Sequence, residues 1–189
     1  MKYNAGNVES VKNALVRLGV EPTVSDDAEV LKAADKVIFP GVGEASTAMK
    51  YLRERNLDTA IKSLAQPVLG ICLGMQLLCD SSDENDTRCL GILPYRVRKF
   101  VSETLKIPQM GWNNIFGLQS KLFAGIDENA YVYFVHSFYV ESGAETIAAC
   151  DYGVNFSAAV EHKNFYAVQF HAEKSGAVGA KILENFLNL

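Results

Sequence analysis

One cysteine of this chain lies in a sequence setting typical of a nucleophile. The segment Gly70-Ile71-Cys72-Leu73-Gly74 matches the nucleophile-elbow pattern G-x-S-x-G, with cysteine in place of serine. An apolar run at residues 68–71 precedes Cys72, and a helical stretch follows it to Leu78. Free backbone N–H groups at the start of that helix favour a thiolate, the nucleophilic form of cysteine. We therefore predict Cys72 as a nucleophile, with the alternative that it is only structural.

A cysteine nucleophile needs a base, and the chain has three histidines: His136, His162 and His171. His171 directly follows an apolar segment, so it should emerge at the carboxyl end of a strand, where ligands collect in open α/β sheets. Glu173 lies two residues further on, and positions i and i+2 of an extended segment face the same side. A carboxylate there can orient the imidazole and stabilise its charged form. This pair alone is equally compatible with a surface salt bridge, but beside the cysteine elbow it predicts a Cys-His-Glu triad.

Acyl transfer also produces an oxyanion, which needs hydrogen-bond donors. The backbone N–H of Leu73, the residue after the nucleophile, is one candidate. The segment Pro40-Gly41-Val42-Gly43 ends another apolar run and offers a second glycine-rich backbone. By itself this segment is equally compatible with a simple strand-to-helix turn.

The composition limits the other classes of site and partner. The formal charge of -4 gives no general basic surface, which argues against nucleic acid and anionic membranes as partners. Cys79, Cys89 and Cys150 lack the spacing of zinc ligands, so we expect them to be buried structural residues, with no metal. Residues 1–10 are polar and no apolar run approaches the roughly 20 residues of a membrane span, which predicts a cytoplasmic protein with reduced thiols.

The elements around these residues predict an α/β fold. Apolar residues recur at helical spacing from Val8 to Leu18, with Asn7 as a possible N-cap and Gly19 ending the run. Strands at 36–39 and 68–71, each followed by a turn and a helix, indicate a parallel sheet with crossover helices. The second half predicts strands at 96–101, 131–135, 146–150, 156–161 and 165–170, then a closing helix through Leu187. We predict one domain over residues 1–189, three-layered, with a mostly parallel open sheet and an antiparallel extension.

The N-terminus is unusual for such a fold. A helix that begins near Asn7 is normally preceded by a strand, but only six residues precede it and they are not an apolar run. We therefore expect the first strand of the sheet to be missing.

The order Cys72, His171, Glu173 and the elbow Gly-Ile-Cys-Leu-Gly-Met-Gln resemble the class I, or triad, glutamine amidotransferases, whose fold is flavodoxin-like. Within that superfamily, five further segments are similar to the glutaminase subunits of imidazole glycerol phosphate synthases: Tyr3-Asn4-Ala5-Gly6-Asn7, Pro40-Gly41-Val42-Gly43, Pro108-Gln109-Met110-Gly111-Trp112-Asn113, Tyr133-Phe134-Val135-His136-Ser137 and His171-Ala172-Glu173-Lys174-Ser175. Ala172 replaces a proline common in the superfamily, which loosens the backbone slightly and removes no reacting group.

This resemblance implies hydrolysis of L-glutamine to glutamate and ammonia through a thioester on Cys72, without a cofactor. It also implies a heterodimer with a (β/α)8-barrel cyclase subunit. That partner would use the ammonia in histidine biosynthesis to make imidazole glycerol phosphate and an aminoimidazole carboxamide ribotide.

The resemblance further implies roles for residues that match the family's motifs. The oxyanion would be bound by backbone N–H groups of Val42 and Leu73. The amino-acid end of glutamine would be held by Gly41, Gly43, Gln76, Glu84, His136, Ser137 and Phe138. The cyclase would be contacted by Met110, Trp112, Asn113, Tyr133 and Lys174.

For several of these residues a structural interpretation stays open. Trp112 is a core residue or an exposed aromatic anchor, and the loop signals Gly111 and Asn113 beside it favour the anchor. Tyr133 could belong to an ordinary buried strand, and Glu84 to a solvated acidic loop.

Other functions remain as alternatives. A paralogous amidotransferase could supply ammonia to another synthase. A stand-alone cysteine hydrolase or protease would not need the Pro40 to Gly43 segment or Gln76. An inactive subunit is disfavoured because all three triad residues are present.

Overall fold

Strand β2 (Val68–Cys72) is buried along its whole length and lies at the centre of the largest sheet. The computed structural model describes residues 1–4 and 7–189. Within it, β2 pairs in parallel with β1 (Val37–Gly41) and with β11 (Phe165–Val168). The carboxyl ends of these three parallel strands therefore meet at one edge, which is the edge that carries Cys72.

Two further strands extend this sheet in the antiparallel sense. β11 pairs with β10 (Asn155–His162), and β10 pairs with β9 (Thr146–Asp151), which gives the order β1-β2-β11-β10-β9. The predicted combination of parallel strands and an antiparallel extension is confirmed.

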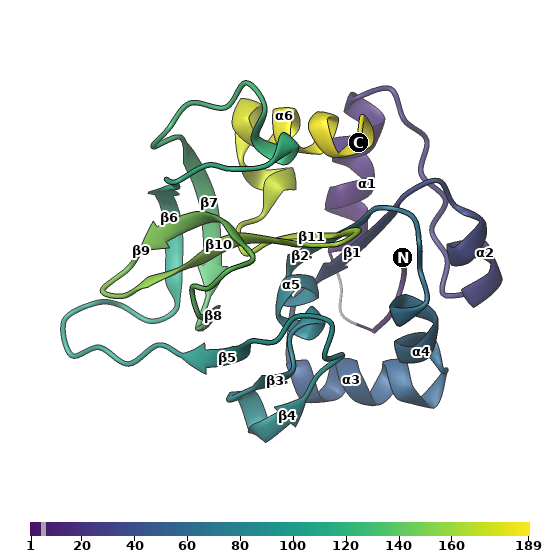
Figure 1. Ribbon diagram of the computed structural model, residues 1–189, viewed down its shortest axis with the longest axis horizontal. Coiled ribbons are helices and arrows are strands. Elements are labelled where there is room, and N and C mark those ends of the chain that lie inside the picture. Colours follow the sequence, from purple (N-terminus) through teal and green to yellow (C-terminus); the bar gives the residue numbers. More distant parts are fainter. Residues whose placement is uncertain (5–6) are drawn as a thin grey trace.

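Helices cover both faces of the sheet, so the fold has three layers (Figure 1). On one face lie α1 (Val8–Arg17) and α6 (Gly176–Leu187), and on the other lie α3 (Ala45–Glu54), α4 (Leu57–Lys62) and α5 (Leu73–Leu78). Alternation along β2 explains the two cores, because Val68 packs with the α3–α5 side while Leu69 and Ile71 pack with the α1 and α6 side.

Two smaller sheets complete the chain. One has the order β4-β3-β5-β8 and the other pairs β6 with β7. Their strands are β3 (Ser81–Ser82), β4 (Thr87–Arg88), β5 (Arg96–Lys99), β6 (Gln109–Asn114), β7 (Tyr131–His136) and β8 (Phe138–Val140). The remaining short helices are the α-helix α2 (Ala28–Ala33) and the 3-10 helices η1 (Glu84–Asp86), η2 (Lys121–Phe123) and η3 (Ala172–Lys174).

Trp112 lies in a strand that the sequence patterns did not predict. Residues 109–114 form strand β6, which pairs antiparallel with β7 through six consecutive positions. Gly111 and Asn113 read locally as loop residues, but the pairing partner Tyr131–His136 supplies the hydrogen bonds that make the segment extended.

The described N-terminal residues 1–4 form no strand, and β1 is the edge strand of the large sheet. The terminal amine of Met1 instead donates to the carbonyl oxygen of Ile38 in β1, at 2.9 Å. Ala5 and Gly6 lie outside the described residues. Asn7 precedes α1 as predicted, but its side chain makes no capping hydrogen bond to the helix.

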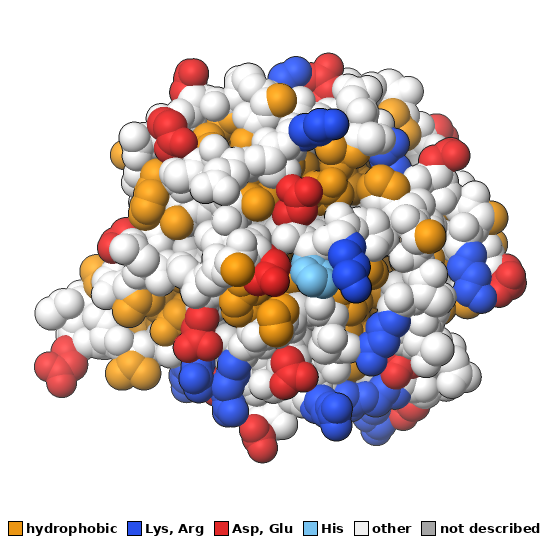
Figure 2. All heavy atoms as spheres, viewed as in Figure 1, with side chains coloured by type: hydrophobic (Ala, Val, Ile, Leu, Met, Phe, Trp, Pro, Cys, Tyr) orange, Lys and Arg blue, Asp and Glu red, His pale blue; other side chains and the backbone are white. Residues whose placement is uncertain are grey.

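Among the described residues, no helix combines the length and apolar character that crossing a bilayer requires. Figure 2 shows acidic and basic side chains interspersed on the face in view, with hydrophobic side chains scattered between them.

Candidate active site

Cys72 has the strained backbone of a nucleophile elbow. Its φ of 54° and ψ of -110° are unfavourable for a residue with a Cβ. The strand and helix on either side pass very close, since a Cβ at Gly74 would overlap the carbonyl oxygen of Phe39 and one at Gly70 would lie 3.0 Å from the backbone nitrogen of Met75. Glycine at both positions lets the turn form and places Cys72 at the start of α5.

His171 and Glu173 form a buried pair. Nδ1 of His171 lies 2.7 Å from Oε1 of Glu173, and their side chains are 1% and 0% exposed. The same oxygen of Glu173 accepts a hydrogen bond from Nδ2 of Asn7 at 2.5 Å. Nε2 of His171 has no hydrogen-bond partner within the described part of the protein. The carboxylate therefore fixes the Nδ1–H tautomer and leaves Nε2 for the reacting groups.

The charge of the imidazole depends on its neighbours. Burial by itself lowers the pKa of His171, but the neighbouring Cys72 and Glu173 outweigh burial and raise the pKa from 6.5 to about 9. An imidazolium beside a thiolate is the form in which His171 can later give a proton to a leaving group.

The backbone of His171 is fixed to β7. Its N–H donates to the carbonyl of Tyr133 at 2.9 Å. The buried hydroxyl of Ser175 donates to the carbonyl of His171 at 2.7 Å and accepts from the N–H of Tyr133 at 2.9 Å. The position of the imidazole is thus coupled to the strand that carries Tyr133.

Most of the residues predicted for the site line one cavity of about 300 Å³, a volume at the lower end of the range for small-ligand sites. Of the predicted residues, it is lined by Val42, Gly43, Cys72, Leu73, Gln76, Glu84, His136, Ser137, Phe138 and His171. Pro108 and Val135 complete the lining. Gly41 does not line the cavity but pairs in register with Cys72, beside it on the neighbouring strand β1.

One wall of the cavity contains a neutral histidine. Burial is the main cause that lowers the pKa of His136 from 6.5 to about 4. Its Nδ1 lies 2.7 Å from the carbonyl oxygen of Phe138, and its Nε2 lies 3.0 Å from Oε1 of Gln109. Both ring nitrogens are therefore occupied by acceptors of the protein. His136 is therefore a structural support, and what it offers the cavity is its backbone.

Gln76 is held in place by two acceptors. Its Nε2 donates to the carbonyl of Phe138 and to Oε1 of Gln169, each at 3.0 Å. Gln169 in turn donates from Nε2 to Sγ of Cys72 at 3.7 Å. Both N–H groups of Gln76 are engaged within the protein, so Oε1 is the atom it can offer a ligand.

Glu84 lies at the other side of the cavity. Its Oε2 accepts a hydrogen bond from the N–H of Ala45, the first residue of α3, at 2.7 Å. Burial is the main cause that raises the pKa of Glu84, and the hydrogen bond from Ala45 offsets part of this shift. This residue is half-buried and structurally held, which favours the predicted site residue over a solvated loop.

The residues predicted for the partner surface lie mainly on the β6-β7 ribbon. Met110 and Trp112 are 60% and 55% exposed on one face of β6, so Trp112 is not a core residue. The ring of Trp112 meets that of Tyr133 edge-on, with centroids 6.0 Å apart. Lys174 is exposed in η3, whereas Nδ2 of Asn113 donates to the carbonyl of Asp151 and points away from this face.

The other cysteines are buried free thiols, as expected. Burial raises the pKa of Cys89 and of Cys150 to about 12, and raises that of Cys79 well above its ordinary value. Cys72 is therefore the thiol suited to nucleophilic chemistry. No group of three or more potential metal ligands occurs in the described ranges.

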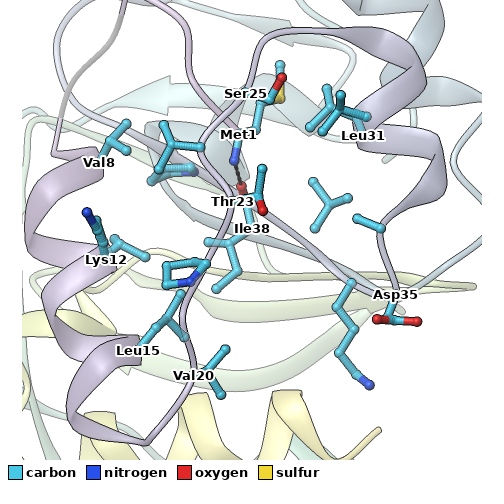
Figure 3. A pocket seen from close by; sticks show the side chains of 18 of the residues that line it. Met1, Val8, Lys12, Leu15, Val20, Thr23, Ser25, Leu31, Asp35 and Ile38 are labelled. Carbon is cyan, nitrogen blue, oxygen red and sulfur yellow. Dashed lines mark hydrogen bonds between the residues drawn. The ribbon is translucent and has the colours of Figure 1, made fainter.

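A larger cavity of about 760 Å³ lies away from these residues, along β1. Figure 3 shows side chains of α1, of Thr23 and of Leu31 directed into this cavity. The hydrogen bond from the amine of Met1 to the carbonyl of Ile38 is drawn there as a dashed line. Its lining includes none of Cys72, His171 and Glu173. Size alone would select this cavity, but the chemistry-bearing side chains select the smaller one.

Comparisons with known proteins agree with this geometry. Residues 2–189 match the family described as Glutamine amidotransferase class-I. The chain belongs to the class I glutamine amidotransferase family. Relatives of this amidotransferase include the imidazole glycerol phosphate synthase subunit HisH of Bacteroides fragilis, which is 56% identical over 100% of this chain and 97% of its own. The HisH subunit of Escherichia coli K12 is 51% identical over 97% of this chain and 94% of its own.

Solved structures share the fold of this amidotransferase at low sequence identity. A structure described as a glutamine amidotransferase has a TM-score of 0.74 at 20% identity and covers 97% of this chain and 94% of its own. The glutaminase domain of Trypanosoma brucei CTPS, solved with acivicin, has a TM-score of 0.64 at 15% identity, covering 96% of this chain and 86% of its own.

Four residues that the sequence did not single out as site residues support this amidotransferase's site: Asn7, Gln109, Gln169 and Ser175. Gln169 precedes His171 by two, so the same i, i+2 reasoning that selected Glu173 could have selected it. The contacts of Asn7 and Gln109, and that of Ser175 with Tyr133, join segments far apart in the sequence and carry no local signal.

Proposed function

We propose that this chain is the glutaminase subunit of an imidazole glycerol phosphate synthase and that Cys72, His171 and Glu173 are its catalytic triad. The observation that carries the proposal is the buried His171–Glu173 pair beside a cysteine with elbow geometry, both at one edge of the parallel strands. The full-length similarity to HisH subunits supports the choice of synthase.

The reaction follows from the site's groups. The thiolate of Cys72 attacks the side-chain amide carbon of glutamine, and the carbonyl oxygen becomes an oxyanion near the backbone N–H groups of Leu73 and Val42. His171 donates its Nε2 proton to the amide nitrogen, so that ammonia leaves and a thioester remains. Water then attacks the thioester while His171 accepts its proton, and glutamate leaves as the thiolate is restored. Glu173 stabilises the imidazolium throughout.

Charge complementarity suggests how glutamine is oriented. Glu84 and Oε1 of Gln76 are acceptors, so both suit the α-ammonium group of the substrate rather than its carboxylate. The carboxylate would then face backbone N–H groups of the residues 136–138 segment and of Gly43. This refines the sequence-based role of Gln76, whose N–H groups are already occupied.

The ammonia released at Cys72 needs an acceptor protein. We assign the face formed by the exposed Met110 and Trp112 and the half-buried Tyr133 as the docking surface for a (β/α)8-barrel cyclase. Exposed aromatic residues of this kind commonly serve as interface anchors. Tyr133 belongs to this face and is also bonded to His171 and Ser175, so docking can influence the position of the base.

Reconstitution with the cyclase tests the function. The chain and the cyclase should co-purify, and together they should convert the phosphoribulosyl formimino precursor to imidazole glycerol phosphate with glutamine as the nitrogen source. A chain that hydrolyses glutamine but does not support this synthesis would be a paralogue serving another synthase. Hydrolysis of unrelated amides or peptides without glutamine turnover would instead identify a stand-alone hydrolase.

A further inference from the structure

We propose that Gln169 is a positioning residue for Cys72, which it holds and stabilises as a thiolate through an N–H···S hydrogen bond. The inference rests on the proposed glutaminase function and adds to it a residue outside the triad. Gln169 follows β11 and has no exposed surface, and its Nε2 lies 3.7 Å from Sγ of Cys72.

The orientation of the Gln169 amide is determined by a chain of hydrogen bonds that starts at a backbone carbonyl. The carbonyl oxygen of Phe138 can only accept, so Gln76 must direct its N–H2 group there, at 3.0 Å. That same N–H2 group meets Oε1 of Gln169, also at 3.0 Å. With its oxygen engaged by a donor, Gln169 has only its N–H2 group to direct at the sulfur.

The state of the sulfur decides what this bond contributes. As a thiol, Cys72 can donate to the carbonyl of Val135, 3.9 Å from Sγ. As a thiolate it can donate to nothing, and a carbonyl oxygen nearby is then unfavourable. The N–H of Gln169 favours the charged sulfur in addition to the imidazolium of His171, because a hydrogen bond to the charged form lowers the free energy of that form.

The same chain of hydrogen bonds, from Phe138 through Gln76 and Gln169, also connects the nucleophile to the substrate cavity. Gln76 and Phe138 line the cavity, and Gln169 bridges them to Sγ from behind. A movement of the 136–138 segment would therefore change the donor presented to the thiolate. His171 supplies the proton and Gln169 holds the sulfur, so the two residues have separable effects.

Alkylation of Cys72 by iodoacetamide tests the proposal without requiring glutamine turnover. The pH midpoint of the alkylation rate should rise by about one unit in Gln169→Met, which keeps the side-chain length and removes the donor. It should rise further, by roughly two units, in Gln169→Glu, which brings a negative charge to the sulfur. Gln76→Met leaves Gln169 in place but removes the bond that orients it, so its midpoint should lie between those of the parent chain and Gln169→Met.

Two controls accompany this series. Cys72→Ala gives the background from the three buried cysteines. Gln66→Met removes a comparable amide, which donates to the carbonyl of Leu31 at 2.7 Å far from Cys72, and should leave the midpoint unchanged.

Steady-state kinetics in the complex with the cyclase give the second readout. Gln169→Met should lower kcat by roughly tenfold and change KM by less than about threefold, since the lost bond is to the nucleophile rather than to the substrate. Unchanged midpoints in folded Gln169→Met and Gln169→Glu would overturn the proposal, even with the glutaminase active. If Gln169→Met does not fold, the pH midpoints of alkylation are compared among the parent chain, Gln76→Met and Gln169→Glu. The proposal predicts that the midpoints rise in that order, and equal midpoints or the reverse order would also overturn it.

Discussion

Asn7 and Glu173 are 166 residues apart in the sequence and are joined by a hydrogen bond of 2.5 Å from Nδ2 to Oε1. Glu173 also accepts from His171 through that oxygen, and its Oε2 has no partner within the described residues. Asn7 thus supplies the second donor to the carboxylate that bonds His171, at the position where we expected a helix cap.

Asn7→Ala should therefore reduce glutamine turnover without abolishing it. Loss of one donor leaves Glu173 less well oriented, and we expect roughly a fivefold to twentyfold fall in kcat, consistent with about 1 to 2 kcal/mol for a hydrogen bond to a charged group. Asn114→Ala, which removes an exposed amide bonded to Asn129, is the matched control and should retain full activity. Equal activities of the two variants would show that Asn7 does not act through Glu173.

Removing the nucleophile should separate the two half-reactions. Cys72→Ala in the complex should abolish synthesis from glutamine but leave synthesis from added ammonium salts nearly intact, because ammonia then bypasses this subunit. Cys89→Ala, which removes a buried thiol away from the cavity, should behave like the parent chain. Glutamate release by Cys72→Ala would exclude Cys72 from the mechanism.

The charge of His171 should depend on Cys72. Burial lowers the pKa of His171, but the neighbouring Cys72 and Glu173 outweigh burial and raise the pKa from 6.5 to about 9. Its favourable pairing is therefore fully present below pH 6.5 and is lost as the pH rises through about 9. Glutamine turnover should fall over the same upper range, since the neutral ring cannot protonate the leaving ammonia.

An NMR titration of the histidine rings measures this coupling directly. In Cys72→Ala the midpoint of His171 should move down by a unit or more, on the order expected when a neighbouring opposite charge is removed. His136, whose pKa is lowered to about 4 chiefly by burial, serves as the internal reference. A midpoint for His171 that stays near 9 without Cys72 would contradict the ion pair.

Glutaminase activity should depend on the docked partner. We expect slow glutamate release by the chain alone and a rise on the order of 10² to 10³ with the cyclase and its nucleotide ligand, the size expected when one oxyanion donor is gained. Gly43, whose φ is 106°, gives the loop next to Val42 a backbone that can reorient.

Trp112→Ala tests the docking surface. Truncating this aromatic residue should weaken association by more than about 2 kcal/mol, or roughly thirtyfold in Kd. Val24→Ala removes an exposed apolar residue on the far side of β1 and should not change Kd. Full turnover by the isolated chain would refute partner control while leaving the triad assignment in place.

The open edge of β1 predicts a gain in stability from an added strand. The cavity of about 760 Å³ beside β1 and the buried amine of Met1, whose pKa burial lowers from 8.0 to about 6, are both costly features of this edge. An apolar strand fused before Met1 should pair with β1, fill the cavity and remove the amine. We expect at least 1 kcal/mol, or about 2 to 4 °C in Tm, over a Gly-Ser extension of equal length. Coincident melts would contradict this interpretation of the edge.

Features that depend on neighbouring residues could be predicted from local sequence patterns. The elbow at Cys72, strands β2, β10 and β11, and helices α1 and α6 follow from local periodicity and glycine spacing. The placement of His171 follows as well, because its position just after a strand is a local property. The extended segment from which we predicted Glu173 is wrong, since Glu173 lies in the 3-10 helix η3, and its contact with His171 forms through that turn instead.

The side chains that complete the site come from distant segments, and their positions depend on how these segments pack. Residues 109–114 carry loop signals, yet β7 makes them a strand that exposes Trp112. Gln169 is directed at Cys72 because Phe138 fixes Gln76, and Asn7 reaches Glu173 because α1 packs against the segment after β11. Hydrogen-bond orientation inside a buried site depends on every partner present, so no local pattern of side chains could have specified these contacts.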